Sequence, residues 1–238
     1  MIIPAAGLGT RMASVPSIKT KKPAATKQFT ELGGTPILIH TLRKFAESPE
    51  VSDIYIALRE NEIEGFGARL QKEAKEVVQK TIHLVAGGEH RQHSVGNAMN
   101  SFSLSDDDIV LVHDAVRPFV TGEIIRDVIR AAEKYGAAIA GLPAVDTVKQ
   151  VERTSEGALI TATLPRERVV LAQTPQAFRY DVLKKAFDEA AADGFMGTDE
   201  ASLVERSGHA VAVVMGSPRN IKITAPADME LAEFFLKR

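Results

Sequence analysis

The sequence predicts a single three-layer α/β domain, residues 1–238, built around a mostly parallel twisted sheet. Short apolar runs, as expected for buried strands, alternate with longer amphipathic segments, as expected for helices. The run at 109–112 is continuously apolar, which is typical of a strand covered on both faces. The composition, 45% hydrophobic and 25% charged over 238 residues, is that of an ordinary domain with ample core.

The expected elements follow the hydrophobic periodicity of the chain, which opens on a short apolar run. Pro36 suits the first position of a helix, and Thr198 suits a helix N-cap. Helices are expected at 36–46, 61–79, 91–102, 121–135, 180–192, 199–207 and from Pro226 onward. Further strands are expected at 54–58, 82–85, 109–112, 137–142, 211–215 and 220–223.

Residues 144–162 break the alternation of strands and helices. Two segments with strand character, 147–151 and 158–162, flank a turn that contains Gly157, and this pattern predicts a hairpin. A β-arm at about 143–170 is therefore expected. It either projects and pairs with another subunit or is an ordinary edge hairpin.

The first eleven residues end in a glycine-rich segment, with Gly7 and Gly9 followed by Arg11. Backbone N–H groups of such a loop can surround a phosphate, and the arginine adds a permanent charge. A plain glycine turn after an edge strand fits these residues equally well. The Walker loop does not match, and Met12 stands where the dinucleotide fingerprint needs a third glycine.

Residues with binding chemistry follow several predicted strands. In a parallel sheet, ligands bind beyond the carboxyl ends of the strands. These ends carry Ala5–Gly7 and Arg11, then Gly87–Glu89 with Arg91 and Ser94, then His113–Pro118, and later Asn220–Lys222. Small residues suit a flat base, cations suit phosphates, and an acid suits a metal or a hydroxyl. Together they indicate a site for a phosphorylated nucleotide.

Composition disfavours several other classes of function. The formal net charge of −2 gives no overall attraction to nucleic acid or to a membrane, and the absence of cysteine excludes disulfides and thiolate metal sites. His90 and His93 lie three residues apart, but no third metal ligand is evident nearby. No run has membrane-spanning length, and the start lacks the features of a signal peptide. We expect a cytoplasmic protein, or a plastid one in a plant, although no transit peptide is visible.

Eight motifs occur in order along the chain: 4–12, 27–28, 87–94, 113–118, 146–147, 173–178, 198–202 and 220–224. With these motifs the chain resembles the 2-C-methyl-D-erythritol 4-phosphate cytidylyltransferase family over essentially its whole length. The resemblance implies a Rossmann-like nucleotidyltransferase fold and an enzyme of non-mevalonate isoprenoid biosynthesis. It would transfer CMP from CTP to methylerythritol phosphate, giving 4-diphosphocytidyl-2-C-methyl-D-erythritol and pyrophosphate, with Mg²⁺ bridging the triphosphate.

The same resemblance implies roles for individual residues. Arg11 and Lys27 would stabilise charge on the triphosphate, while Arg166 and Lys222 would position the attacking phosphate. CTP would contact Pro4, Ala5, Ala6, Gly7, Gly9, Gly88, Glu89, Ser94, Asp114 and Ala115. Methylerythritol phosphate would contact Arg117, Thr147, Arg166, Thr174 and Lys222. Asp114 is the candidate protein ligand of a Mg²⁺ ion held mainly by phosphates. At position 89 the family usually has aspartate rather than glutamate.

The resemblance also implies a homodimer, because the β-arm of the family crosses to the neighbouring subunit and the active site is shared. Residues 12–26 depart from the family pattern, since they separate Arg11 from Lys27 by more residues than usual. Lys27 is matched because Gln28 and Phe29 follow it, and the alternative is that a lysine of the insertion also reaches the phosphates, namely Lys19, Lys21 or Lys22. The insertion is expected to be either a lid ordered by CTP or a surface insertion with no role.

Three other functions fit parts of the sequence. A ribitol 5-phosphate cytidylyltransferase shares several motifs, whereas 198–202 and the Leu164–Pro165 pair before Arg166 favour methylerythritol phosphate. A dehydrogenase-like dinucleotide binder is disfavoured by Met12. A non-catalytic nucleotide-binding regulator is disfavoured because all four candidate catalytic residues are present.

Overall fold

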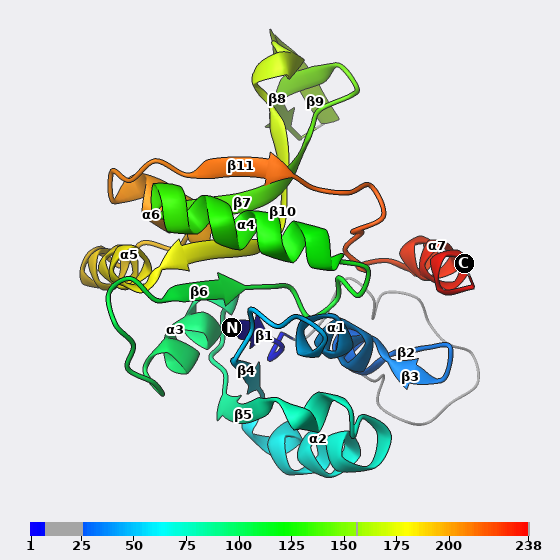
Figure 1. Cartoon of the computed structure of the whole chain (residues 1–238). Helices are drawn as coiled ribbons and strands as arrows, with labels where there is room; N and C mark the ends of the chain where they lie inside the picture. The colour runs from blue at the N-terminus through cyan, green and yellow to red at the C-terminus, as the bar shows by residue number, and fades with distance from the viewer. Residues whose placement is uncertain (8–25, 156, 238) are drawn as a thin grey trace.

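The computed structural model describes residues 1–7, 26–155 and 157–237. Within these ranges a seven-stranded sheet has the order β11-β7-β10-β6-β1-β4-β5 (Figure 1). Its strands are β1 (Ile2–Pro4), β4 (Asp53–Leu58), β5 (Thr81–Ala86), β6 (Ile109–Val112), β7 (Ala137–Pro143), β10 (Val170–Arg179) and β11 (Ala212–Met215). β6, β1, β4 and β5 pair in parallel, as do β7 and β11. The predicted mostly parallel α/β fold is therefore confirmed.

Helices cover both faces of the sheet and make the fold three-layered. Buried side chains of α1, α2 and α4 form one core cluster with the sheet, and those of α3, α5 and α6 form another. A third, smaller cluster joins α7 to residues around Val116 and Ile223. The helices are α1 (Ile37–Ala46), α2 (Glu60–Glu73), α3 (Arg91–Met99), α4 (Gly122–Tyr135), α5 (Tyr180–Asp193), α6 (Glu200–Arg206) and α7 (Pro226–Leu236).

Strand β10 is not predicted by the sequence pattern, and it runs antiparallel to both of its neighbours, β6 and β7. Pro175 interrupts its apolar pattern, and a proline cannot donate a hydrogen bond to a neighbouring strand. The register with β7 shifts between Ala172 and Gln176, so the proline lies in an irregular stretch where its missing donor is tolerated. β10 brings the chain from the arm back into the middle of the sheet.

The predicted helix at 61–79 is wrong in its second half. α2 ends at Glu73, and a separate 3-10 turn follows at Val77–Gln79. Ala74 leaves the helical region, with φ −143°, and both Ala74 and Val77 are fully buried. Because of the break, both of these apolar side chains reach the core. A continuous amphipathic helix would place them differently.

Two further expectations are corrected. Residues 220–223 form no strand, because Asn220 bonds through its side chain to the Thr174 carbonyl instead of entering a ladder. The N-cap of α6 is Asp199 rather than Thr198, since Asp199 accepts a hydrogen bond from the Ser202 N–H at 3.0 Å. A small hairpin, β2 (Glu31–Leu32) with β3 (Thr35–Pro36), was also not expected, and α1 begins after Pro36.

The predicted hairpin is confirmed as a separate two-stranded sheet of β8 (Val148–Thr154) and β9 (Gly157–Leu164). It projects from the body of the molecule (Figure 1), and most of its described residues are exposed. At its root the Ala144 N–H donates to the Val169 carbonyl at 3.0 Å. The arm therefore leaves β7 and returns to β10 through one closed junction.

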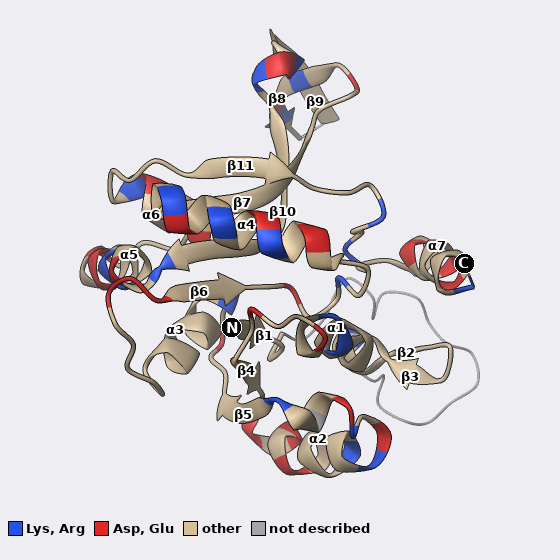
Figure 2. Ribbon diagram, in the orientation of Figure 1, with Lys and Arg blue, Asp and Glu red and all other residues tan. Residues whose placement is uncertain are grey.

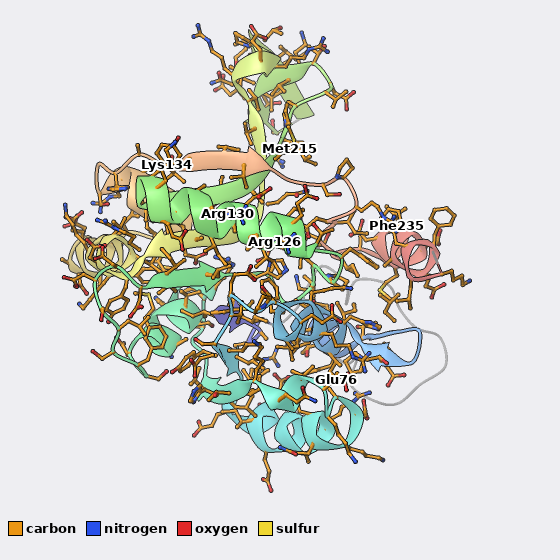
Figure 3. The ribbon with its side chains drawn as sticks, viewed as in Figure 1. Glu76, Arg126, Arg130, Lys134, Met215 and Phe235 are labelled. Atoms are coloured by element: carbon orange, nitrogen blue, oxygen red, sulfur yellow. The ribbon has the colours of Figure 1, made fainter. Side chains whose placement is uncertain are left out.

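Lys, Arg, Asp and Glu residues are spread over the helices, the arm and the connecting loops (Figure 2). On α4, the exposed Arg126, Arg130 and Lys134 recur every four residues (Figure 3), while Ile125 and Ile129 are buried beneath them. Among the described residues, no helix combines the length and the apolar character needed to cross a membrane.

The N-terminus of α4 gives a stability prediction. Thr121 Oγ1 accepts a hydrogen bond from the Ile124 N–H at 3.3 Å. Thr121→Ala should lower the free energy of unfolding by about 1 kcal/mol, because this N–H loses its acceptor. Thr121→Ser keeps the hydroxyl and is the matched control in urea unfolding. Equal stability of the alanine and serine variants would contradict the prediction.

Candidate active site

The carboxyl ends of β1, β5 and β6 meet at a cavity of about 260 Å³, called cavity A. Larger cavities of about 680 and 510 Å³ also occur in the described part of the chain, but neither includes these strand ends. Cavity A therefore lies where ligands bind in parallel sheets. It is lined by Pro4–Gly7, Lys27, Gln28, Gly88–Arg91, Ser94, Asp114–Val116 and Lys222.

The segment after β1 is fixed by two short hydrogen bonds. The Ala5 N–H donates to the Ala57 carbonyl at 2.7 Å, and Gln28 Nε2 donates to the Ala5 carbonyl at 2.7 Å. Gln28 is buried, so this contact holds the neighbouring Lys27 at the wall of cavity A. The Lys27–Gln28 pair thus places a cation at the cavity next to a buried side chain that fixes the position of the backbone.

The turn after β5 depends on the absence of side chains. A Cβ on Gly87 would lie 2.5 Å from the Ala6 Cβ, and one on Gly88 would overlap His93. The buried Ser94 hydroxyl accepts a hydrogen bond from the Gly88 N–H at 3.1 Å. The predicted site residues Gly88 and Ser94 therefore lie together, and the serine fixes the shape of the glycine turn.

A second cavity of about 190 Å³, called cavity B, adjoins cavity A. Three side chains, Arg91, Asp114 and Lys222, line both cavities, and we call these three residues the seam. The seam is therefore where molecules bound in the two cavities would meet. The other residues lining cavity B are Arg117, Ala172–Thr174, Gln176, Thr198 and Asp199.

Asp114 is the centre of the seam, and its buried carboxylate contacts three cations. Oδ1 accepts from Arg91 Nε at 3.3 Å, and Oδ2 accepts from Lys222 Nζ at 2.8 Å and from Arg117 Nε at 3.2 Å. Burial alone would raise the pKa of this carboxyl, but Arg91, Lys222 and Arg117 outweigh it and hold the pKa well below its usual range. Asp114 is therefore ionised at neutral pH.

Arg91 is held from its other side by Glu200, the first residue of α6. Arg91 Nη1 donates to both Glu200 oxygens, at 2.7 and 2.8 Å, and Glu200 is 1% exposed. Burial raises the pKa of the Glu200 carboxyl, and the Arg91 guanidinium opposes that shift. Sequence analysis counted Arg91 among the cations that suit phosphates and gave Glu200 no role, although the motif 198–202 was a signal for the glutamate.

Thr174 is fixed behind the seam by a buried histidine. His113 Nε2 donates to the Arg117 carbonyl, 3.0 Å away, because a carbonyl can only accept. Nδ1 of the neutral ring is then the acceptor, so the Thr174 hydroxyl donates to it at 3.1 Å. Thr174 Oγ1 also accepts from the Asp114 N–H at 3.0 Å. This threonine therefore supports the backbone of Asp114.

Asn220 joins the segment that carries Lys222 to β10. Its fully buried side chain donates to the Thr174 carbonyl at 2.9 Å and to Gln173 Oε1 at 3.2 Å. Its carbonyl accepts from Arg117 Nη1 at 2.8 Å. Sequence reasoning did not assign it a role, and its place two residues before Lys222 was the available signal.

The remaining predicted residues lie outside both cavities or outside the described ranges. Thr147 and Arg166 are exposed at the arm, where Arg166 Nη1 donates to the Val145 carbonyl at 2.8 Å. Gly9, Arg11 and nearly all of the insertion 12–26 fall outside the described residues. The roles expected for these residues stay predictions.

A magnesium ion would find few protein ligands in the described part of the chain. No group of three or more acidic, histidine or cysteine side chains there could hold a metal. Asp114 is the acid shared by both cavities, and both of its oxygens already contact cations. The expected role of Asp114 as one ligand of a Mg²⁺ ion held mainly by phosphates stays a prediction.

The buried His113 predicts how stability depends on pH. Burial lowers the pKa of His113 from 6.5 to about 4. Because the unfolded chain takes up this proton at higher pH than the folded one, stability should fall as pH drops from about 6.5 to about 4, by roughly 3 kcal/mol in total. In urea unfolding at several pH values, His113→Gln should lose this part of the pH dependence. An unchanged slope in the variant would contradict the prediction.

Comparisons with known proteins show the family of the chain. The family model described as 2-C-methyl-D-erythritol 4-phosphate cytidylyltransferase matches residues 1–238. A protein of that name from Acidobacterium capsulatum is 57% identical, with 100% of this chain and 97% of the relative covered. One from Solibacter usitatus is 52% identical, with 100% and 95% covered.

A solved structure points to the same family. The Francisella tularensis 2-C-methyl-D-erythritol 4-phosphate cytidylyltransferase is 36% identical, with a TM-score of 0.78 and coverage of 98% of this chain and 97% of that one. The sequence match extends over the whole chain, and the likeness of fold includes nearly all of it. The chain therefore belongs to the 2-C-methyl-D-erythritol 4-phosphate cytidylyltransferase family.

Proposed function

We propose that this chain transfers a cytidylyl group from CTP to 2-C-methyl-D-erythritol 4-phosphate. The products are 4-diphosphocytidyl-2-C-methyl-D-erythritol and pyrophosphate, and the pathway is non-mevalonate isoprenoid biosynthesis. Family membership supports the substrates. The observation that carries the proposal is the seam, where two adjoining cavities share two cations and one carboxylate.

The reaction joins two anions, so the site must offset charge and align atoms. An oxygen of the 4-phosphate attacks the α-phosphorus of CTP, the new P–O bond forms, and the bond to the β-phosphate breaks to release pyrophosphate. Such chemistry needs positioned cations more than a covalent nucleophile. Lys27 lines cavity A, and Lys222 lies at the seam, where its ammonium can meet an attacking phosphate from cavity B.

We assign cavity A to CTP and cavity B to methylerythritol phosphate. Pro4–Gly7, Gly88, Glu89, Ser94 and Ala115 surround the nucleotide, with Gly9 and Arg11 completing the triphosphate loop. Arg117, Thr174 and Lys222 serve the acceptor, and Arg166 and Thr147 reach it from a second subunit. Because the Thr174 hydroxyl already donates to His113, its remaining lone pair would accept from a substrate hydroxyl.

Magnesium remains a part of this proposal. The ion would come with CTP, held mainly by the triphosphate, as Mg²⁺ commonly is in nucleotide sites. Asp114 would become a ligand only if a cation left its carboxylate.

A homodimer is the second part of the proposal. Exposed apolar side chains gather on the arm and near its base, where Met215 ends β11 (Figure 3). Leu159 and Ile160 are 66% and 63% exposed, and Met215 is 66% exposed. Contiguous patches of exposed apolar side chains mark interaction surfaces, which supports the arm as a subunit contact. A partner subunit that covers the arm would receive Arg166 of this subunit at its own acceptor cavity.

A cytoplasmic location stays a prediction.

Pyrophosphate release tests the proposed substrates. With CTP and Mg²⁺, methylerythritol phosphate should be turned over at a higher kcat/KM than ribitol 5-phosphate. The family motif 198–202 and the match over the whole chain support this preference. A higher kcat/KM for ribitol 5-phosphate would reassign the acceptor, and release with neither polyol would contradict the transferase.

Mixed subunits test whether sites are shared. Lys27→Ala and Arg166→Ala homodimers should each be nearly inactive. In a mixed dimer one site receives an intact Lys27 and an intact partner arginine, so random mixing should restore roughly one quarter of wild-type activity. Each variant mixed with itself is the control. No recovery in mixed dimers verified by mass spectrometry would contradict a shared site.

A further inference from the structure

Glu200 is the buried acid that the proposed reaction leaves without a role. It lines neither cavity, and within the described part of the chain its carboxylate contacts one side chain, Arg91, through a single nitrogen. A buried carboxylate is costly unless it is paired, and a pair of this kind rarely adds net stability over an apolar packing. A gain in stability therefore does not explain why Glu200 is buried next to the seam.

Glu200 begins a row of side chains of alternating charge. The row ends at Lys222, the cation that we assign to the acceptor phosphate. The order is Glu200, Arg91, Asp114 and Lys222. The contact distances along it are 2.7 Å, 3.3 Å and 2.8 Å. Arg91 is thus held closely by Glu200 and only loosely by Asp114. The shortest contact of the Asp114 carboxylate is therefore the one with Lys222.

The Glu200 end of this row is rigid. Asp199 caps α6 through Ser202, and Gln176 of β10 donates to Asp199 Oδ2 at 2.8 Å. The amide oxygen of Gln176 accepts from the Ala201 N–H at 3.0 Å. The first turn of α6 is therefore fastened to the sheet on both sides of Glu200, and the glutamate is a fixed anchor for Arg91.

We propose that Glu200 is a positioning residue for the reaction, because it restrains Arg91 and so leaves Asp114 to hold Lys222 in place for the acceptor phosphate. This inference rests on the proposed function of the seam. Without the Glu200 charge, Arg91, which now contacts only Oδ1 of Asp114, turns its fork onto both oxygens and competes with Lys222 for Oδ2. The ammonium then loses its fixed position, to which in-line attack is sensitive.

The kinetic test is a double-mutant cycle of Glu200→Gln with Lys222→Ala. In the wild-type background, the isosteric Glu200→Gln should lower kcat/KM for methylerythritol phosphate by about tenfold to a hundredfold. In the Lys222→Ala background the same change should have little further effect, because the residue on which it acts is absent. Glu200→Asp, which keeps the charge, should show a smaller loss.

A purely structural role for Glu200 predicts other results. It would lower the melting temperature and the fraction of active enzyme, and Glu200→Gln would lower kcat/KM by the same factor in both backgrounds. With an active wild-type enzyme, equal factors in the two backgrounds, or an unchanged kcat/KM in Glu200→Gln, would overturn the inference. An inactive wild-type enzyme would instead contradict the proposed function.

A crystal structure of Glu200→Gln tests the inference without any activity. The expected result is Arg91 on both Asp114 oxygens and a broken contact between Lys222 Nζ and Asp114. If Glu200→Gln does not fold, the structure of Glu200→Asp provides the same test, with a lengthened contact expected. An unchanged Lys222–Asp114 contact in the variant that folds would overturn the inference.

Discussion

The carboxylate of Asp114 is the constraint on which the rest of the site depends. It draws together Arg91 at the start of α3, Arg117 after β6, and Lys222 from the segment after β11. These cations would repel one another without it, and its burial is tolerable only because they surround it. One side chain thus fixes three segments that are distant in the sequence, at the edge of the sheet where the two cavities meet.

Uncharged hydrogen bonds support this charged cluster from behind. His113, fixed as one tautomer by the Arg117 carbonyl, orients Thr174, and Thr174 holds the Asp114 N–H. Asn220 ties the segment before Lys222 to the same threonine through its carbonyl. Neutral partners set the backbone of the seam without adding charge to it. The positions of the cations are therefore fixed by groups that do not titrate near neutral pH. The positive charge of the cations stays available to attract a phosphorylated substrate.

Sequence reasoning predicted the parts of this molecule that local pattern determines. The apolar run 109–112 is β6, and the residues after β1, β5 and β6 do converge on one cavity. Sequence reasoning failed where contacts between residues that are distant in the sequence determine the structure. β10 was hidden because Pro175 breaks the strand pattern, and only the irregular pairing with β7 admits it. Glu200 reads as a surface acid at a helix start, and its burial follows from Arg91, which lies more than a hundred residues away. The expected roles of Arg11, Thr147 and Arg166 stay predictions, because Arg11 lies outside the described residues and the other two line neither cavity.

The closed junction at the root of the arm has a consequence for how the chain tolerates insertions and deletions. β8 and β9 pair only with each other in the described part, so lengthening both strands near their connection leaves the main sheet as it is. The stretch between Leu164 and Val170 is different, because β10 begins directly after it. An added residue there must be accommodated within the short turn Arg166–Arg168; otherwise β10 shifts by one position and Thr174 and Gln176 turn to the opposite face. Drift in length among relatives is therefore expected at the tip of the arm and not at its return.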